Sequence, residues 1–158
     1  MVKIAVFVSG GGTNLQALID ACASGSINGE IVLVVSNRKN AYGLERAKNA
    51  NIKAEYIKDD DVLIKRLEEE KIDLIVLAGY LSIVSDKLIY LYENRIINIH
   101  PALIPSFCGP GFYGLHVHKH AFARGVKVAG ATVHFVSSIV DGGPIILQES
   151  IDVSDCNS

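Results

Sequence analysis

The chain has 158 residues, of which 49% are hydrophobic and 20% charged, and its formal net charge is −2. This is the composition of a globular protein with a core, and a single domain is the simplest expectation at this length. The lack of a basic excess argues against nucleic-acid binding, and no apolar run reaches the roughly 18–20 residues of a membrane span. The three cysteines show no Cys-x-x-Cys spacing, which argues against a disulfide framework or a zinc site. We therefore expect a protein of the reduced cytoplasmic compartment.

Strand-like and helix-like patterns alternate through the first hundred residues. Continuous apolar runs predict strands buried on both faces at residues 4–8, 31–35 and 73–78, with a shorter strand at 54–57. Helical spacing of apolar residues predicts helices after residue 14, at 42–49, after Asp59 and at 85–92. This order predicts an α/β fold with a doubly wound, mostly parallel sheet and helices on both faces. Ligands bind such sheets at the carboxyl ends of the strands.

A glycine-rich loop, Ser9-Gly10-Gly11-Gly12-Thr13-Asn14, separates the first strand from the first helix. Such a loop points backbone N–H groups and the positive end of a helix at one place, where phosphate binds readily. It is neither a Walker A loop, since no Gly-Lys-Ser/Thr follows, nor Gly-x-Gly-x-x-Gly, since position 15 is leucine. A tight turn with Thr13 or Asn14 as the helix N-cap explains the loop equally well.

A second candidate site lies in the stretch from Arg95 to Pro105. It reads as a short strand that stops at Pro101, which has no N–H for a ladder. Since strand side chains alternate, Asn98 and His100 should share one side. An amide donor beside an imidazole is a candidate for polarising a carbonyl and handling a proton. The alternative is a polar strand end with a hydrogen-bonded histidine.

The last third of the chain predicts a loop at 105–114, a helix ending near Gly125, a strand at 131–136 and a further strand from Pro144. His116 and His120 could share a helix face, but they lack carboxylate or cysteine companions, so we expect no metal site. His134, inside a strand, is interpreted as structural. Asp141 lies in a turn, where an aspartate usually accepts a local backbone hydrogen bond.

Four segments taken together indicate a family, and they are Ser9-Gly-Gly-Gly-Thr-Asn-Leu-Gln16, Asn98-Ile-His-Pro-Ala-Leu-Ile-Pro105, Thr132-Val-His-Phe-Val136 and Asp141-Gly-Gly-Pro-Ile-Ile-Leu-Gln148. The chain resembles the phosphoribosylglycinamide formyltransferases, the folate-dependent enzymes of purine biosynthesis, from the first strand to about Val153. The resemblance implies a doubly wound α/β sheet. It also implies transfer of a formyl group from 10-formyltetrahydrofolate to the amine of glycinamide ribonucleotide, without a metal.

The same resemblance implies roles for particular residues. Asn98, His100 and Asp141 match the catalytic asparagine, histidine and aspartate, and Gly12, Thr13 and Asn14 match the loop that holds the substrate phosphate. In these roles Asn98 donates to an oxyanion, and a carboxylate at Asp141 favours the charged form of His100. Two segments match the folate pocket, namely Leu81, Ser82, Ile83 and Val84, and Ser137, Ser138, Ile139 and Val140.

Two departures from the family pattern affect these expectations. Many relatives carry a basic residue where Ser82 stands, so a contact to the folate tail is lost or supplied elsewhere. Relatives also continue past the end of this chain, so we expect that residues 1–158 form a single formyltransferase domain without its C-terminal part. Apolar residues of the last strand would then lack cover. We therefore expect weak folate binding, poor formyl transfer, and pairing with a second copy or another chain.

Three rival activities follow from the same residues. A 10-formyltetrahydrofolate hydrolase would share the catalytic residues, but such enzymes usually carry an N-terminal regulatory domain and lack the glycine loop. A methionyl-tRNA formyltransferase would need a basic surface and an RNA-binding domain. A folate- or nucleotide-binding remnant without turnover is the non-enzymatic rival.

Overall fold

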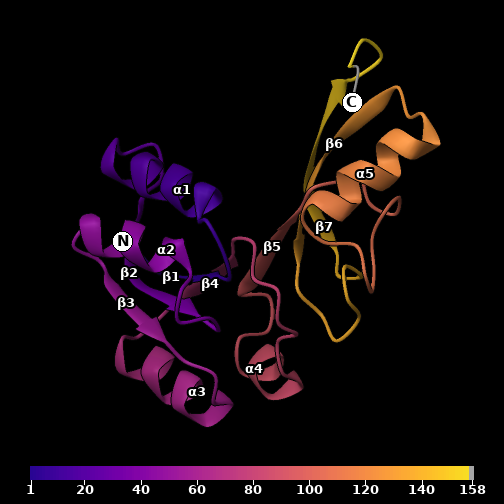
Figure 1. Cartoon of the computed structure of the whole chain (residues 1–158). Helices are drawn as coiled ribbons and strands as arrows, with labels where there is room; N and C mark the ends of the chain where they lie inside the picture. The colour runs from indigo at the N-terminus through magenta and orange to yellow at the C-terminus, as the bar shows by residue number, and fades with distance from the viewer. Residues whose placement is uncertain (157–158) are drawn as a thin grey trace. The chain divides into compact units, whose positions relative to one another are not determined.

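The computed structural model describes residues 1–156, in which strands and helices alternate for most of the chain (Figure 1). Contacts between residues divide the chain into two compact units, Met1–Ile96 and Ile97–Ser158. The expectation of a single formyltransferase domain stays a prediction. Among the described residues, no helix has both the length and the apolar character needed to cross a bilayer.

The strands of the first unit form a parallel arrangement in the order β3-β2-β1-β4. Their bounds are β1 (Val2–Val8), β2 (Gly29–Ser36), β3 (Lys53–Tyr56) and β4 (Leu74–Leu77). The central strands β1 and β2 are buried on both faces, which explains why their sequences are continuous apolar runs rather than alternating patterns. The predicted parallel sheet is confirmed.

Four helices accompany these strands: α1 (Thr13–Ala23), α2 (Tyr42–Asn49), α3 (Asp60–Glu69) and α4 (Asp86–Leu91). The chain runs outward from β1 through β2 to β3 and then returns to β4, and right-handed crossovers therefore place α1 and α3 on opposite faces. Figure 1 shows α1 and α3 on opposite sides of the strands. The predicted α/β fold with helices on both faces is confirmed.

The change of direction at β1 creates a switch point, where loops after neighbouring strands diverge and ligands usually bind. The loops after β1 and β4 are joined there by hydrogen bonds. Ser9 N–H donates to the Gly79 carbonyl over 3.1 Å, and Leu81 N–H donates to Ser9 Oγ over 2.8 Å. The glycine loop thus lies at the carboxyl end of the sheet, as expected.

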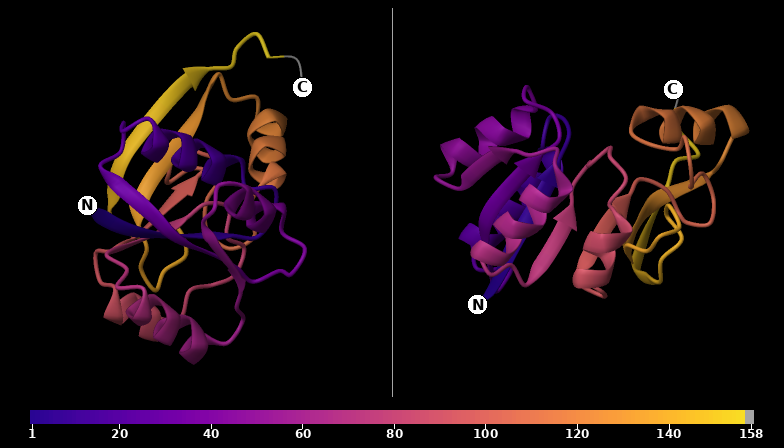
Figure 2. Two further views of the ribbon diagram at one scale, coloured as in Figure 1. Left: turned by 90° about the vertical axis from the view of Figure 1, so that its left-hand side faces the viewer. Right: turned by 90° about the horizontal axis from the view of Figure 1, so that it is seen from below.

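The second unit contains β5 (Ile96–His100), α5 (Leu115–Arg124), β6 (Val128–Phe135) and β7 (Ile145–Asp152). Strand β6 pairs antiparallel with both β5 and β7, and Figure 2 shows β6 and β7 side by side with α5 to one side of them. The connection from β6 to β7 is too short for a crossover helix, which requires an antiparallel pair. Every residue of β7 is exposed, including the apolar Ile145, Leu147 and Ile151.

Candidate functional site

The three predicted catalytic side chains lie together in the second unit. His100 is buried, the Asp141 side chain is only 9% exposed, and His100 Nδ1 lies 3.6 Å from Asp141 Oδ2. Asn98 lies on the same strand as His100, two residues earlier, and its amide is joined to the cluster through His134. The structure therefore brings together residues that are more than forty positions apart in the sequence.

The orientation of His100 is fixed by a backbone group. Its Nε2 lies 2.7 Å from the carbonyl oxygen of Phe107, which can only accept a hydrogen bond, so Nε2 carries a proton. Nδ1, the other ring nitrogen, faces the carboxylate of Asp141 at 3.6 Å, which is longer than a hydrogen bond.

His134 is a fourth member of the cluster that sequence reasoning missed. Its Nε2 lies 3.1 Å from Asn98 Nδ2 and 3.7 Å from Asp141 Oδ1, and its Nδ1 lies 2.9 Å from the carbonyl oxygen of Phe135. Strand pairing places His134 directly opposite Asn98. The signal in the sequence was the matched segment around His134, but the pairing register that gives this histidine its neighbours cannot be read from one strand alone.

Burial and charge act in opposite directions on the pKa values of this cluster. Burial raises the pKa of Asp141, but the His134 ring, the Gly109 N–H at 2.9 Å and the charge of His100 together lower it below its usual value. Burial likewise lowers the pKa of His134, but Asp141 and the Phe135 carbonyl raise it more, so the result is a raised pKa. The cluster therefore favours an ionised carboxylate at Asp141.

The turn that carries Asp141 is constrained by its backbone. Asp141 adopts a positive φ of 55°, a left-handed conformation that aspartate tolerates better than most residues. Two residues later, a Cβ on Gly143 would lie 1.7 Å from the Phe135 carbonyl oxygen, so only glycine fits there. The predicted turn is present, although the Asp141 side chain accepts its backbone hydrogen bond from distant Gly109 rather than from a local group.

A buried hydroxyl fixes the loop that follows β5. Thr132 Oγ1 donates to the Ala102 carbonyl over 2.7 Å and accepts from Ile104 N–H over 3.1 Å. Gln148 Nε2 lies 3.0 Å from the same hydroxyl and 2.9 Å from the Ile104 carbonyl. These bonds tie strands β6 and β7 to the segment immediately after His100, which limits how far this histidine can shift.

The glycine loop of the first unit exposes unpaired backbone donors. Within residues 1–156, the backbone N–H groups of residues 11–14 have no protein acceptor. Gly12 is the N-cap residue of α1, with a positive φ of 71° and no side-chain cap. The alternative interpretation of Thr13 or Asn14 as the N-cap is therefore wrong, because a left-handed glycine makes the turn instead. Free N–H groups at a helix start are suited to bind an anion.

The first predicted folate segment borders a cavity in the first unit. This cavity has a volume of about 340 Å3, and its lining includes Tyr80, Ser82, Ile83 and Val84. The Ser82 hydroxyl accepts a 2.6 Å hydrogen bond from Asn37 Nδ2, so it is held in place by a polar partner. Leu81 does not line the cavity and is 44% exposed.

The second predicted folate segment immediately precedes Asp141. Its apolar side chains, Ile139 and Val140, are 69% and 42% exposed. Ser137 bonds locally with the backbone of Ile139, and no hydrogen bond of the Ser138 side chain is found within residues 1–156. Exposed apolar side chains beside the Asp141 carboxylate could contact a flat aromatic ligand, but the folate roles of both segments stay predictions.

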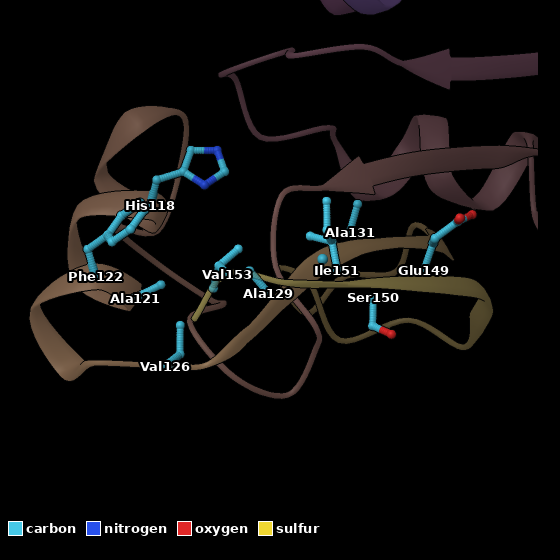
Figure 3. Close-up of a pocket in the computed structure, with 11 residues that line it drawn as sticks. His118, Ala121, Phe122, Val126, Ala129, Ala131, Glu149, Ser150, Ile151 and Val153 are labelled. Atoms are coloured by element: carbon cyan, nitrogen blue, oxygen red, sulfur yellow. The ribbon is translucent and has the colours of Figure 1, made fainter. Parts of the chain in front are cut away.

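A larger cavity of about 620 Å3 lies between α5 and the β6–β7 pair (Figure 3). His118 and Phe122 line it from the helix, and Ala131 and Ile151 line it from the strands. None of the clustered residues borders this space, and its lining is mostly apolar, so it lacks convergent polar groups for catalysis. In the described part of the chain, no group of three or more histidine, cysteine, aspartate or glutamate side chains could hold a metal ion.

Comparison with known proteins identifies the family. A model of the formyl transferase family matches residues 2–158. The chain is 43% identical to the phosphoribosylglycinamide formyltransferase of Haemophilus influenzae, covering 97% of this chain and 74% of that protein. It is 40% identical to the chloroplastic enzyme of the same name from Arabidopsis thaliana, of which it spans 55%, with 96% of this chain covered.

Solved structures agree with the sequence relatives. The crystal structure of glycinamide ribonucleotide transformylase 1 from Symbiobacterium toebii has a TM-score of 0.89 and 44% sequence identity, covering 97% of this chain and 74% of that one. The resemblance predicted from the four sequence segments is thereby confirmed. The chain belongs to the formyl transferase family, among the phosphoribosylglycinamide formyltransferases.

Proposed function

We propose that the protein containing this chain transfers a formyl group from 10-formyltetrahydrofolate to the amine of glycinamide ribonucleotide, a step of purine biosynthesis. The observation that carries this proposal is the cluster of Asn98, His100 and Asp141, in which an amide donor and an imidazole are held beside a carboxylate. Relatives with this activity in their names match nearly the whole chain. A cytoplasmic location and the absence of a bound metal stay predictions.

The reaction needs charge stabilisation and one proton transfer. The neutral amine attacks the formyl carbon, a C–N bond forms, and the carbonyl electrons move onto oxygen. The resulting intermediate has an oxyanion and a protonated amine nitrogen. That nitrogen loses a proton, the bond to the folate nitrogen breaks, and the folate nitrogen takes up a proton. The products are formylated glycinamide ribonucleotide and tetrahydrofolate.

Each member of the cluster suits one of these requirements. The Asn98 amide nitrogen has two N–H groups, so it can bond to His134 and still donate to the oxyanion. His100 donates its Nε2–H to the Phe107 carbonyl and turns Nδ1 toward Asp141, so the imidazole lies beside the carboxylate in a fixed orientation. Asp141 is the proton acceptor of the cluster, directly or through a water molecule, because its lowered pKa keeps it ionised at neutral pH.

The glycine loop is proposed to hold the phosphate of the nucleotide substrate. Gly12, Thr13 and Asn14 supply free N–H groups at the start of α1, where the helix dipole also favours negative charge. The segments at residues 81–84 and 137–140 are proposed to contact the folate. Their exposed apolar side chains are available for such a contact.

A formyl-transfer assay with and without glycinamide ribonucleotide tests the proposal. Tetrahydrofolate should appear only when the nucleotide is present, together with one equivalent of formylated product. Release of formate in the absence of the nucleotide would instead identify a 10-formyltetrahydrofolate hydrolase. Folate binding without either product would favour a binding protein without turnover. Either of these two results would overturn the proposed transfer.

A further inference from the structure

The carbonyl groups of the glycine loop are bound by helix α2, which decides where the N–H groups of the loop point. Gly43, in the first turn of α2, donates its N–H to the Gly10 carbonyl over 2.9 Å. Arg46, one turn later, donates its Nε–H to the Gly11 carbonyl over 2.7 Å. In a trans peptide the C=O and the following N–H point in opposite directions. The N–H groups of Gly11 and Gly12 therefore point away from α2.

The fit between the loop and α2 is close enough to depend on two glycines. A Cβ on Gly12 would lie 2.7 Å from the Gly43 Cα and 3.3 Å from the Arg46 Cδ. A Cβ on Gly43 would lie 2.8 Å from a methyl group of Val8. The contact brings α2 near enough for a side chain on its second turn to reach the loop backbone.

Arg46 is itself held in one orientation by three neighbours. Its second nitrogen donates to Gln16 Oε1 over 3.3 Å, and the amide of Gln16 is in turn fixed by a 2.9 Å hydrogen bond to Asp20. Its guanidinium carbon lies 5.1 Å from the centre of the Tyr42 ring, within the range of a cation–π contact. Because the planar guanidinium of Arg46 is already held by these partners, little side-chain entropy is lost when it bonds to the Gly11 carbonyl.

The charge of Arg46 is not neutralised by an acidic partner. Among the ion pairs found within residues 1–156, Arg46 takes part in none, and neighbouring Glu45 pairs with Lys48. Arg46 bonds instead to a carbonyl and an amide oxygen, both uncharged. Its positive charge is thus available to an anion bound on the outward face of the loop.

We infer that Arg46 is a positioning residue of the phosphate site, which orients the glycine loop through the Gly11 carbonyl and adds a positive charge next to it. This inference rests on the proposed function, since it assumes that the loop binds the substrate phosphate. Lysine cannot fully replace arginine here, because a single ammonium group cannot reproduce the fork that joins Gly11 to Gln16.

Titration of the 158-residue chain with inorganic phosphate tests the inference, with the backbone amide NMR signals of residues 11–14 as the readout. Phosphate should shift these signals in the unaltered chain. Arg46→Met keeps the aliphatic stem and should raise the phosphate Kd about tenfold, the scale of one lost hydrogen bond to a charged group. Arg46→Lys should fall between the two. Lys48→Met is the matched control, because it removes one positive charge from the same helix, and it should change Kd by less than about twofold.

The outcomes separate the inference from the proposed function. If phosphate shifts the loop amides but Arg46→Met binds it as tightly as Lys48→Met does, Arg46 has no positioning role and the inference fails alone. If phosphate leaves the loop amides of the unaltered chain unshifted, the phosphate site itself is wrong and both fail. Thermal unfolding without phosphate detects a fold defect, and Arg46→Lys then supplies the binding comparison in a chain that keeps its positive charge.

Discussion

The two candidate binding regions of this chain use different parts of the polypeptide. The glycine loop presents backbone N–H groups, and the side chains of Thr13 and Asn14 are exposed. The cluster around Asp141 presents side chains, and its backbone groups serve to orient them. A backbone site depends on which residues allow the chain to approach closely, whereas a side-chain site depends on chemical groups. Substitutions should therefore impair the two regions in different kinetic parameters.

The largest effect is expected in the side-chain region. Asp141→Asn should lower kcat at least about 10²-fold, the usual scale for losing an acid–base group or a charge that stabilises the transition state. Asparagine also tolerates the left-handed backbone of this turn, so the fold should persist. Steady-state formyl transfer measures the loss, and substrate KM values should change far less.

An exposed carboxylate in the same unit provides the control for that substitution. Asp152→Asn makes the same chemical change on β7, outside the cluster, and should leave kcat within about twofold of the unaltered protein, as surface substitutions usually do. Turnover near the original level in Asp141→Asn would contradict the catalytic role of this carboxylate. It would leave Asn98 and His100 to be tested by alanine substitution.

The next effect concerns stability rather than chemistry. Thr132→Val keeps the shape of the side chain but removes the hydroxyl, leaving Ile104 N–H and the Ala102 carbonyl without this partner. We expect a loss of about 2 kcal/mol in the free energy of unfolding, the usual cost of unsatisfied buried groups. Urea unfolding measures it. Thr132→Ser keeps the hydroxyl and should cost about 1 kcal/mol for the lost methyl group. A larger loss for serine than for valine would show that packing, not hydrogen bonding, fixes this loop.

A smaller kinetic effect is expected at the glycine loop. Thr13→Asp places a negative charge at the start of α1, where it should repel the substrate phosphate and raise KM about tenfold with kcat little changed. Thr13→Asn is the neutral control of similar size, and its KM should stay within about threefold. A fall in kcat with unchanged KM would mean that the loop acts in chemistry rather than in binding, which would remove the contrast between the two regions.

The sequence predicted the secondary structure and the clustered side chains more completely than it predicted the conformation of the glycine loop. Apolar runs and helical spacing located β1, α2 and β5 closely, because buried strands and amphipathic helices leave strong periodic signals. The side chains of Asn98, His100 and Asp141 were assigned through matched segments, and the structure brings them together. One of the two interpretations of the loop made Thr13 or Asn14 the N-cap of α1, but the left-handed Gly12 occupies that position. The preference for polar N-cap residues reflects local sequence alone. The close contact between Gly12 and Gly43, which leaves no room for a Cβ at position 12, is a tertiary contact.

Two contacts could not be predicted because they join segments that are far apart. His134 acquires its neighbours only when β6 pairs with β5, and the pairing register is set by tertiary packing. Arg46 reaches the glycine loop only because α2 packs against it, and nothing in the helix sequence distinguishes this arginine from a solvated one. His134 contacts Asn98 and Asp141, and Arg46 contacts Gly11. The matched sequence segments include these contacted residues, so they located both sites, but they did not identify the two residues that hold the sites in place.

The smallest effect, a pH dependence of stability, tests whether His134 belongs to the charged cluster. Its pKa is raised in the folded chain, chiefly by Asp141 against the opposing effect of burial, so the folded state binds the histidine proton more tightly than the unfolded state does. The stabilisation is then fully present below the unfolded pKa of about 6.5 and is lost as the pH rises through the folded value. Urea unfolding should therefore show His134→Gln to be destabilised more at about pH 5.5 than at about pH 8.5.

The lowered pKa of Asp141 affects stability only at more acidic pH. Its contribution is lost only below about pH 4, so it does not mask the difference between about pH 5.5 and about pH 8.5. Thr13→Asn, an exposed change that removes no ionisable group, should show no such trend. A destabilisation of His134→Gln that is equal at both pH values would mean that His134 acts only by packing and by its hydrogen bond to Asn98.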